Sequence, residues 1–289
     1  MKGSPISDYN DLYGWLYELF PINRSLTGSG VRTTLDYLKA IVPGLEIHSV
    51  PTGYTAFDWE VPKEWHCTDA FIEDLDGNTL VDFKQNNLHL VGYSTPFEGR
   101  ISRDELLNHL YTLPDQPYLI PYVTSYYKER WGFCVSHNQL KTFTDDEYYV
   151  SIKSRLFEGV LNYADIIIPG ETDEELLFST YICHPSMANN ELSGPVVATA
   201  LAKYISESET KPRYTYRFVF TPETLGSIVY LSKHSEYLKK NLKAGFVLTC
   251  LGDERRWSYM PSRTGNTYTD SVLEFALKDL KINYDHYSF

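Results

Sequence analysis

The chain has 289 residues, a length that suits one large domain or two. Its residues are 43% hydrophobic and 22% charged, which excludes a disordered chain because enough apolar side chains are present to bury a core. The formal net charge of −12 argues against a nucleic-acid partner and against a polybasic membrane anchor, since both need a basic surface.

The sequence also carries no signal for a membrane-bound or secreted protein. No apolar run approaches the roughly 18 residues that span a bilayer, and no apolar leader follows the first methionine. The four cysteines lie far apart and form no CxxC pair, which argues against a disulfide framework and a structural zinc finger. We therefore expect a cytoplasmic protein without a membrane partner, and leave homo-oligomer formation open.

Two helices are predicted within residues 8–42. The first ends at Pro21, after apolar residues at helical spacing, and the second covers about residues 31–41. The segment between them, Asn23 to Gly30, reads NRSLTGSG. We expect a loop here and not a dinucleotide-binding motif, because no strand precedes the glycines.

Residues 52–145, called the β module below, differ in character from the rest. Aromatic residues, prolines and short alternating runs dominate, with a hairpin turn predicted at Asp76 and Gly77. Only residues 103–112 have a helical pattern. The sequence thus predicts a mostly β domain inserted into another domain made of residues 1–51 and 146–289.

From residue 146 onward, predicted strands alternate with predicted helices. The strands cover residues 148–159, 161–170, 175–184, 214–221 and 244–250, and the helices cover 193–204, 225–238 and 270–280. Such alternation is typical of an α/β fold whose central sheet is mainly parallel and flanked by helices.

Polar residues follow three of these strands at the point where each strand ends. They are His184, Glu223 and Asp253. Because ligands of open α/β sheets bind beyond the carboxyl ends of the strands, this layout indicates a metal site or an acid–base site built on the sheet. The segment Asn189–Asn190–Glu191, which precedes the next helix, adds two amides and a carboxylate.

Simpler explanations exist for each of these residues. Asn190 or Ser193 could cap the helix that follows, and Glu223 could favour a helix dipole. A nucleophilic Cys183–His184 pair is disfavoured, because neighbours on a strand point to opposite faces. The sequence contains no GxSxG, HExxH or P-loop motif.

Four stretches resemble a known family over nearly the whole chain. They read NRSLTGSGVR, CHPSMANNELSG, PETLGS and SRTGNTYTD. They resemble uncharacterised bacterial aminopeptidase-like proteins that carry a protease-associated-like β insertion and are related to di-zinc aminopeptidases. The resemblance implies zinc as cofactor and hydrolysis of an amide by a metal-bound water, with a peptide or amine-bearing small molecule as substrate.

The resemblance also implies roles for individual residues. His184 would be a zinc ligand, and Asn190 would occupy the position of the Asp that bridges two zinc ions. Glu223 would be the general base, and Thr224 would replace the Glu that binds the second zinc ion. Asp253 is the candidate for a further ligand.

Three other residues receive weaker assignments. Glu191 would replace Asn190 as a ligand if the loop is shifted by one residue. Asn189 and Arg263 are candidates for substrate contacts. In the resembling proteins, later segments complete the site, so we expect a C-terminal part to be missing here.

The departures from the family pattern limit what this chain can bind. A carboxamide oxygen binds zinc weakly, and a threonine is a poor zinc ligand. We therefore expect at most one weakly bound zinc ion and little aminopeptidase activity. Two alternatives stay open, namely a catalytically inactive binding protein and an amide hydrolase of surface-polysaccharide metabolism.

Overall fold

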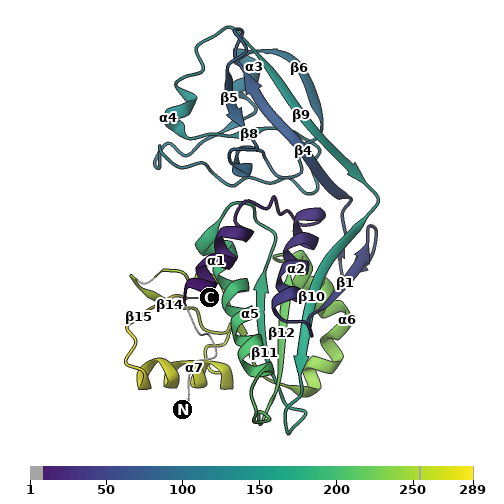
Figure 1. Cartoon of the computed structure of the whole chain (residues 1–289), viewed down its shortest axis with the longest axis vertical. Coiled ribbons are helices and arrows are strands. Elements are labelled where there is room, and N and C mark those ends of the chain that lie inside the picture. The colour runs from purple at the N-terminus through teal and green to yellow at the C-terminus, as the bar shows by residue number, and fades with distance from the viewer. Residues whose placement is uncertain (1–8, 254, 289) are drawn as a thin grey trace.

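The computed structural model describes residues 9–253 and 255–288. Residue 8, where the first helix was expected to begin, lies outside these ranges. The central sheet has five strands in the order β1-β10-β12-β11-β13 (Figure 1). Their bounds are Glu46–Pro51 for β1, Val160–Ile168 for β10, Thr215–Thr221 for β12, Glu175–Tyr181 for β11 and Leu242–Val247 for β13.

The α/β class is confirmed, but the expectation of a mainly parallel sheet is wrong. The pairs β1–β10 and β10–β12 are antiparallel, whereas β12–β11 and β11–β13 are parallel. Parallel neighbours need a long crossover, which helices α5 (Ser193–Ser206) and α6 (Leu225–Asn241) supply. The described residues 169–174, which join β10 to β11, contain no helix, so β10 enters the sheet in the opposite direction.

Helices cover both faces of the central sheet. On one face, α1 (Tyr9–Leu19), α2 (Ser29–Ile41) and α5 bury a core with Phe218 and Phe220 of β12. On the other face, α6 packs on Val219, the residue between them, as the alternation of side chains along a strand requires. Helix α7 (Tyr268–Asp279) lies beside the edge strand β13.

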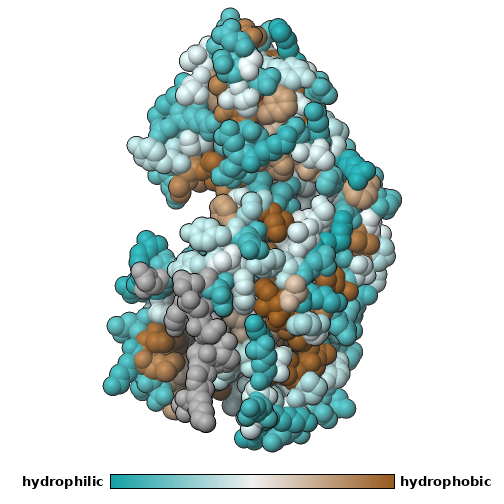
Figure 2. Space-filling view, in the orientation of Figure 1, coloured by the Kyte–Doolittle hydropathy of each residue, from teal (hydrophilic) through white to brown (hydrophobic). Residues whose placement is uncertain are grey.

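A second sheet is fully antiparallel and lies beyond one end of the central sheet (Figure 1). Its strands are β5 (Thr79–Asp82), β4 (Glu64–Glu73), β9 (Glu147–Phe157) and β6 (Phe97–Ser102), in that order. Figure 2 shows the surface hollowed between the two parts on the face in view.

Short elements complete the described chain: β2 (Thr55–Ala56), β3 (Trp59–Glu60), η1 (Asn87–His89), α3 (Arg103–Leu107), β7 (Leu110–Tyr111), β8 (Phe133–Cys134), α4 (His137–Leu140), η2 (Ala188–Leu192), β14 (Trp257–Tyr259) and β15 (Tyr284–His286).

The two parts of the chain share more than a linker. Strand β9 pairs with β4 and β6, so residues 147–157 belong to the four-stranded sheet, although the expected boundary at 145/146 places them in the α/β part. One buried apolar cluster includes Trp65 of β4 together with Val219 of β12 and Val229 of α6. The division into two domains, and the likeness of the β module to a protease-associated domain, therefore stay predictions.

Among the described residues, no helix combines the length and apolar character that crossing a membrane requires.

The segment between α1 and α2 is held by close backbone approaches. Gly28 has a φ of 101°, a value that favours glycine. At Gly30, an added Cβ would overlap the carbonyl oxygen of Asn23 and lie 3.0 Å from the amide nitrogen of Arg24. The start of α2 can therefore rest on residues 23–24 only because position 30 has no side chain.

We expect Gly30→Ala to lower the free energy of unfolding by about 1–3 kcal/mol, the usual cost of overpacking a tight contact. Gly14→Ala is the matched control, because Gly14 is an exposed residue of α1 with no atom within 4 Å of the added Cβ. This control should be neutral or more stable by up to about 1 kcal/mol. Urea unfolding of both variants checks the prediction, and equal stability of the two would contradict it.

Candidate functional site

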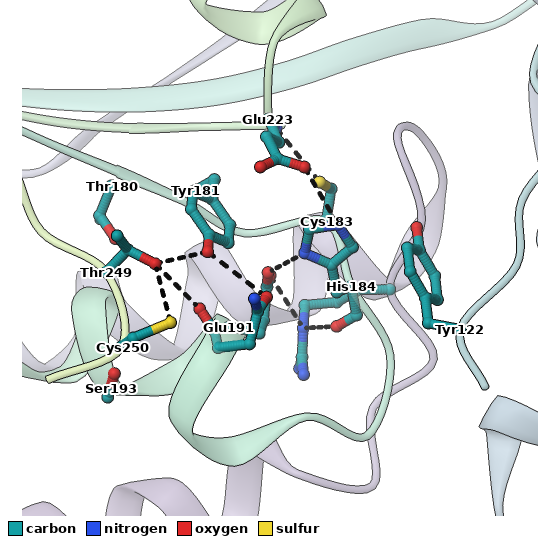
Figure 3. A network of polar contacts seen from close by, with 12 residues as sticks. Tyr122, Thr180, Tyr181, Cys183, His184, Glu191, Ser193, Glu223, Thr249 and Cys250 are labelled. Carbon is teal, nitrogen blue, oxygen red and sulfur yellow. Dashed lines mark hydrogen bonds and ion pairs between the residues drawn. The ribbon is translucent and has the colours of Figure 1, made fainter. Parts of the chain in front are cut away.

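Two of the residues predicted from the sequence meet at the carboxyl ends of two neighbouring strands. His184 follows β11 and Glu223 follows β12, and these strands run parallel (Figure 3). The Nε2 atom of His184 lies 3.3 Å from Oε2 of Glu223. The side chain of His184 is only 8% exposed, whereas that of Glu223 is 50% exposed. The pair thus has a buried member fixed by the protein and a member that solvent and ligands can reach.

The other nitrogen of His184 faces a buried carboxylate. Its Nδ1 lies 2.8 Å from Oε2 of Glu191, which is 1% exposed and belongs to the π-helical turn η2. Burial raises the pKa of the Glu191 carboxyl, and the neighbouring His184 and Arg24 oppose that shift. A histidine held in this way through one ring nitrogen presents the other in a fixed direction.

Arg24 lies behind this pair and was not singled out as a site residue from the sequence. Its Nε donates to the main-chain carbonyl of His184 at 3.0 Å and lies 3.7 Å from Oε1 of Glu191. Its Nη1 donates to the carbonyl of Leu19 at 2.7 Å. The only sequence signal for it is its place in the NRSLTGSG stretch, which the chain shares with the family it resembles.

Two tyrosines contact the His184 ring edge-on. The ring of Tyr122 lies 4.7 Å from it and the ring of Tyr181 lies 5.4 Å from it, both nearly perpendicular. Tyr181 is the last residue of β11, whereas Tyr122 comes from the chain between β7 and β8. Burial raises the pKa of Tyr181 to about 12 and that of Tyr122 further, so both are neutral phenols at physiological pH. The β module thus contributes one wall around His184, a feature that only the tertiary structure reveals.

The loop that carries His184 is tied to the β module by a polar contact as well. Ser186 has a φ of 41°, a left-handed conformation that is costly for this residue. Its hydroxyl donates to Oδ1 of Asn87 at 2.5 Å, and the amide of Asn87 donates to the carbonyl of Pro21 at 3.1 Å. Asn87 therefore holds both the His184 loop and the chain just before Arg24.

The two asparagines of the loop serve different partners. Asn189 accepts a hydrogen bond from the amide of Gly252 at 2.7 Å, which fastens the chain after β13. Asn190 accepts from the Tyr181 hydroxyl at 3.4 Å and so lies beside a residue that touches His184. Among the described residues, α5 has no side-chain cap, and Ser193 instead donates to the carbonyl of Asn189. The capping explanation for Asn190 and Ser193 therefore does not apply.

Three other residues from the sequence analysis are placed less favourably. Asp253 pairs with Arg255, whose Nε donates to the Asp253 carboxylate at 2.8 Å. This contact lowers the pKa of Asp253 to about 2. Arg263 is exposed in the turn before α7. Thr224 is exposed in a left-handed conformation, with a φ of 58°, next to Glu223. The structure does not bring Asp253 into the group around His184 and Glu191. Substrate contacts by Arg263 and Asn189 stay predictions.

Cys183 is buried beside the site without the properties of a nucleophile. Its sulfur accepts the main-chain N–H of Glu223 at 3.1 Å. Burial raises the pKa of the thiol well above its usual range, and Glu191 raises it further. Because the thiolate is the reactive form, Cys183 is held in an unreactive state. Donor atoms of Cys183, His184 and Glu191 lie within 4.8 Å of one another.

Comparison with known proteins identifies relatives over nearly the whole chain. A family model described as "Domain of unknown function (DUF4910)" matches residues 13–289. A candidate polysaccharide biosynthesis protein with an aminopeptidase-like domain, from Clostridium acetobutylicum, is 46% identical over 267 residues, which are 92% of this chain and 61% of that protein. These matches confirm the resemblance to an aminopeptidase-like family.

Solved structures share the fold of this chain. The crystal structure of a candidate peptidase from Clostridium acetobutylicum is 45% identical, with a TM-score of 0.92, and the match covers 97% of this chain and 65% of that one. A zinc aminopeptidase from Bacillus subtilis is 12% identical, with a TM-score of 0.63 over 96% of this chain and 78% of that one, which shows a shared fold. The chain spans less than two thirds of the length of its two Clostridium relatives.

The burial of Cys183 leads to a labelling prediction. Cys250 is exposed and the other three cysteines are buried, with the pKa of Cys67 and Cys134 raised to about 12. At pH 8 we expect iodoacetamide to label Cys250 first, as read by peptide mass spectrometry, because a thiol of pKa 12 is only about 10⁻⁴ thiolate. The variant Cys250→Ser should lose the fast phase. Fast labelling of Cys183 in the folded protein would contradict its assignment as unreactive.

Proposed function

Because the chain belongs to the family described as "Domain of unknown function (DUF4910)" and has an aminopeptidase-like fold, we propose that it is an amide hydrolase with a single metal ion. One observation carries this proposal. The Nε2 atom of His184 and the carboxylate of Glu223 lie 3.3 Å apart beyond the ends of two parallel strands, and Glu191 anchors the opposite nitrogen of the histidine.

The donor atoms fit one zinc ion. Two ligands of a tetrahedral zinc ion, each about 2.0–2.1 Å from the metal, lie roughly 3.3 Å apart. The separation of His184 Nε2 from Glu223 Oε2 has this value. Metal-binding histidines commonly donate their second N–H to a carboxylate, as Nδ1 can donate to Glu191 here. His184 and Glu223 are therefore the residues that would hold the ion.

The same donors do not fit a second ion. Glu191 is occupied by His184 and Arg24, and a fixed guanidinium charge 3.7 Å away repels a further cation. Asn190 offers only an amide oxygen, which binds zinc weakly. Deprotonating Cys183 between Glu191 and Glu223 would place three negative charges together, and its raised pKa opposes this.

The proposed reaction gives Glu223 two roles, as ligand and as base, and gives its neighbours one role each. When bound, zinc would polarise the amide carbonyl and lower the pKa of water. Oε2 of Glu223 would hold the ion, and the other carboxylate oxygen of Glu223 takes the proton of the attacking water and returns it to the leaving nitrogen. Its half-exposed side chain can reach both. Glu191 holds Nδ1 of His184, while Tyr122 and Tyr181 fix the plane of the ring.

A second candidate concerns the substrate. The Clostridium relative that is 46% identical carries a name that refers to polysaccharide biosynthesis. This supports an amide on an amino sugar as substrate, in place of a peptide. An inactive binding protein is the remaining alternative, and it would keep the ligand-binding surface without hydrolysis.

We expect calorimetric titration of zinc into the metal-free protein to show one weak site per chain. Glu223→Gln should weaken it by at least about 10-fold, because a carboxylate ligand becomes an amide. Glu236→Gln is the control, since Glu236 is an exposed carboxylate of α6, the helix that follows Glu223, and pairs only with Lys239 among the ion pairs of the described residues. Asn190→Asp should tighten binding by adding a carboxylate beside Tyr181. Two tight sites in the wild type would contradict the proposal.

Hydrolysis separates the proposed enzyme from the binding protein. We expect slow, zinc-dependent release of product from aminoacyl anilides or N-acyl amino sugars, lost in Glu223→Gln and kept in Glu236→Gln. The set of compounds that is hydrolysed faster, aminoacyl anilides or N-acyl amino sugars, identifies the substrate class. Zinc binding without hydrolysis of either set of compounds would favour the inactive binding protein.

A further inference from the structure

Arg24 is a buried cation for which the proposed reaction has no use. It is 1% exposed, and its side chain has no solvent contact. Removing a guanidinium from water is costly unless the charge is paired and hydrogen-bonded. In the described residues, the charge of Arg24 is only partly hydrogen-bonded. Nη2 of Arg24 and Oε1 of Glu191 are both buried without a hydrogen-bond partner. Each of these two charges is therefore compensated chiefly by the other.

The chain around Arg24 is built to keep it in place. The Ser25 hydroxyl donates to the carbonyl of Thr27 at 2.6 Å, and Thr27 shares a 2.5 Å hydrogen bond with Tyr93. The amide of Trp65 in β4 donates to the same threonine hydroxyl at 3.2 Å. Gly30 packs against the main chain of residues 23–24. The NRSLTGSG stretch, first expected to be a loop, thus has a fixed conformation that buries residues 24–27 and places Arg24 beside Glu191.

Arg24 touches the His184 loop at two points that determine how His184 is aimed. One is the main-chain carbonyl of His184, which Nε of Arg24 binds at 3.0 Å. The other is Glu191, whose second oxygen lies 2.8 Å from Nδ1 of His184. With its main chain and one ring nitrogen both fixed, the histidine can direct only Nε2 toward Glu223.

We propose that Arg24 is a positioning residue of the metal site, which orients Glu191 and the main chain of His184 so that Nδ1 of His184 donates to Glu191 and Nε2 faces the ion. This inference rests on the proposed function of the same site. Arg24 itself touches neither substrate nor metal. A purely structural arginine would support the fold without controlling which ring nitrogen of His184 carries the proton.

The test reads the ring nitrogens of His184 directly in metal-free protein. The chain contains eight histidines, and His184→Gln identifies the signals of His184 in ¹⁵N spectra of protein labelled at histidine. At pH 8 we expect the wild type to show a single tautomer with the proton on Nδ1. Arg24→Met should give a mixture of tautomers and weaken zinc binding about 10- to 100-fold, the usual effect of losing a supporting contact. Arg24→Lys keeps the charge but not the fork of donors, and should show a smaller change of the same kind.

Arg217 provides the matched control. It is also buried and pairs with a buried carboxylate, Glu175 at 2.7 Å, but at the opposite end of β11. Arg217→Lys should lower the melting temperature while leaving the His184 tautomer and the zinc affinity unchanged.

Each outcome separates the role of Arg24 from the proposed function. A wild-type proton on Nε2, or an unchanged tautomer and zinc affinity in Arg24→Lys and Arg24→Met, would overturn the inference. If Arg24→Met does not fold, Arg24→Lys decides alone. A wild type that binds no zinc refutes the proposed metal site, while the tautomer measurement still reports on Arg24.

Discussion

The site depends on one buried ion pair, between Arg24 and Glu191. Both side chains are without solvent contact, and their charged atoms lie 3.7 Å apart. Such a pair adds little to stability by itself, but losing either partner leaves an uncompensated charge in the interior. The pair therefore constrains the three chain segments that it joins, namely the end of α1, the NRSLTGSG stretch and the loop that carries His184.

The sheet topology explains why this constraint acts at a functional position. Strands β11 and β12 are parallel neighbours, so the residues that follow them emerge side by side at the same edge of the sheet. That geometry sets His184 opposite Glu223. The β module then closes the site from the other side through Tyr122, between β7 and β8, and Asn87 of η1. The β module is thus part of the site and not only an addition to the fold.

Much of this architecture could be predicted from the sequence, and the reasons for the failures are physical. Local patterns were enough for α5, α6 and the strands before them, and hence for the meeting of His184 with Glu223. The direction of a strand does not follow from its local pattern. The sequence predicted β10 as a strand, but β10 is antiparallel to β12 because no crossover helix follows it. Strand β9 was found as well, but the alternation of side chains does not say which sheet a strand joins.

The site itself was only half predictable. Glu191 was considered a replacement ligand, yet its partners are Arg24 and the far nitrogen of His184, which no spacing rule reveals. Asp253 has the right residue type at the right strand end, but Arg255, two residues later, takes up its carboxylate. Contacts between segments 160 residues apart, such as Arg24 with His184, come only from the folded chain.

The most direct test of the central claim is a crystal structure of the zinc-loaded protein, with anomalous diffraction recorded on both sides of the zinc absorption edge. We predict one anomalous peak per chain, within bonding distance of His184 Nε2 and the Glu223 carboxylate, with Glu191 still paired with Arg24. Two peaks, or a single peak bound by Glu191 and Cys183 with Arg24 displaced, would contradict the account.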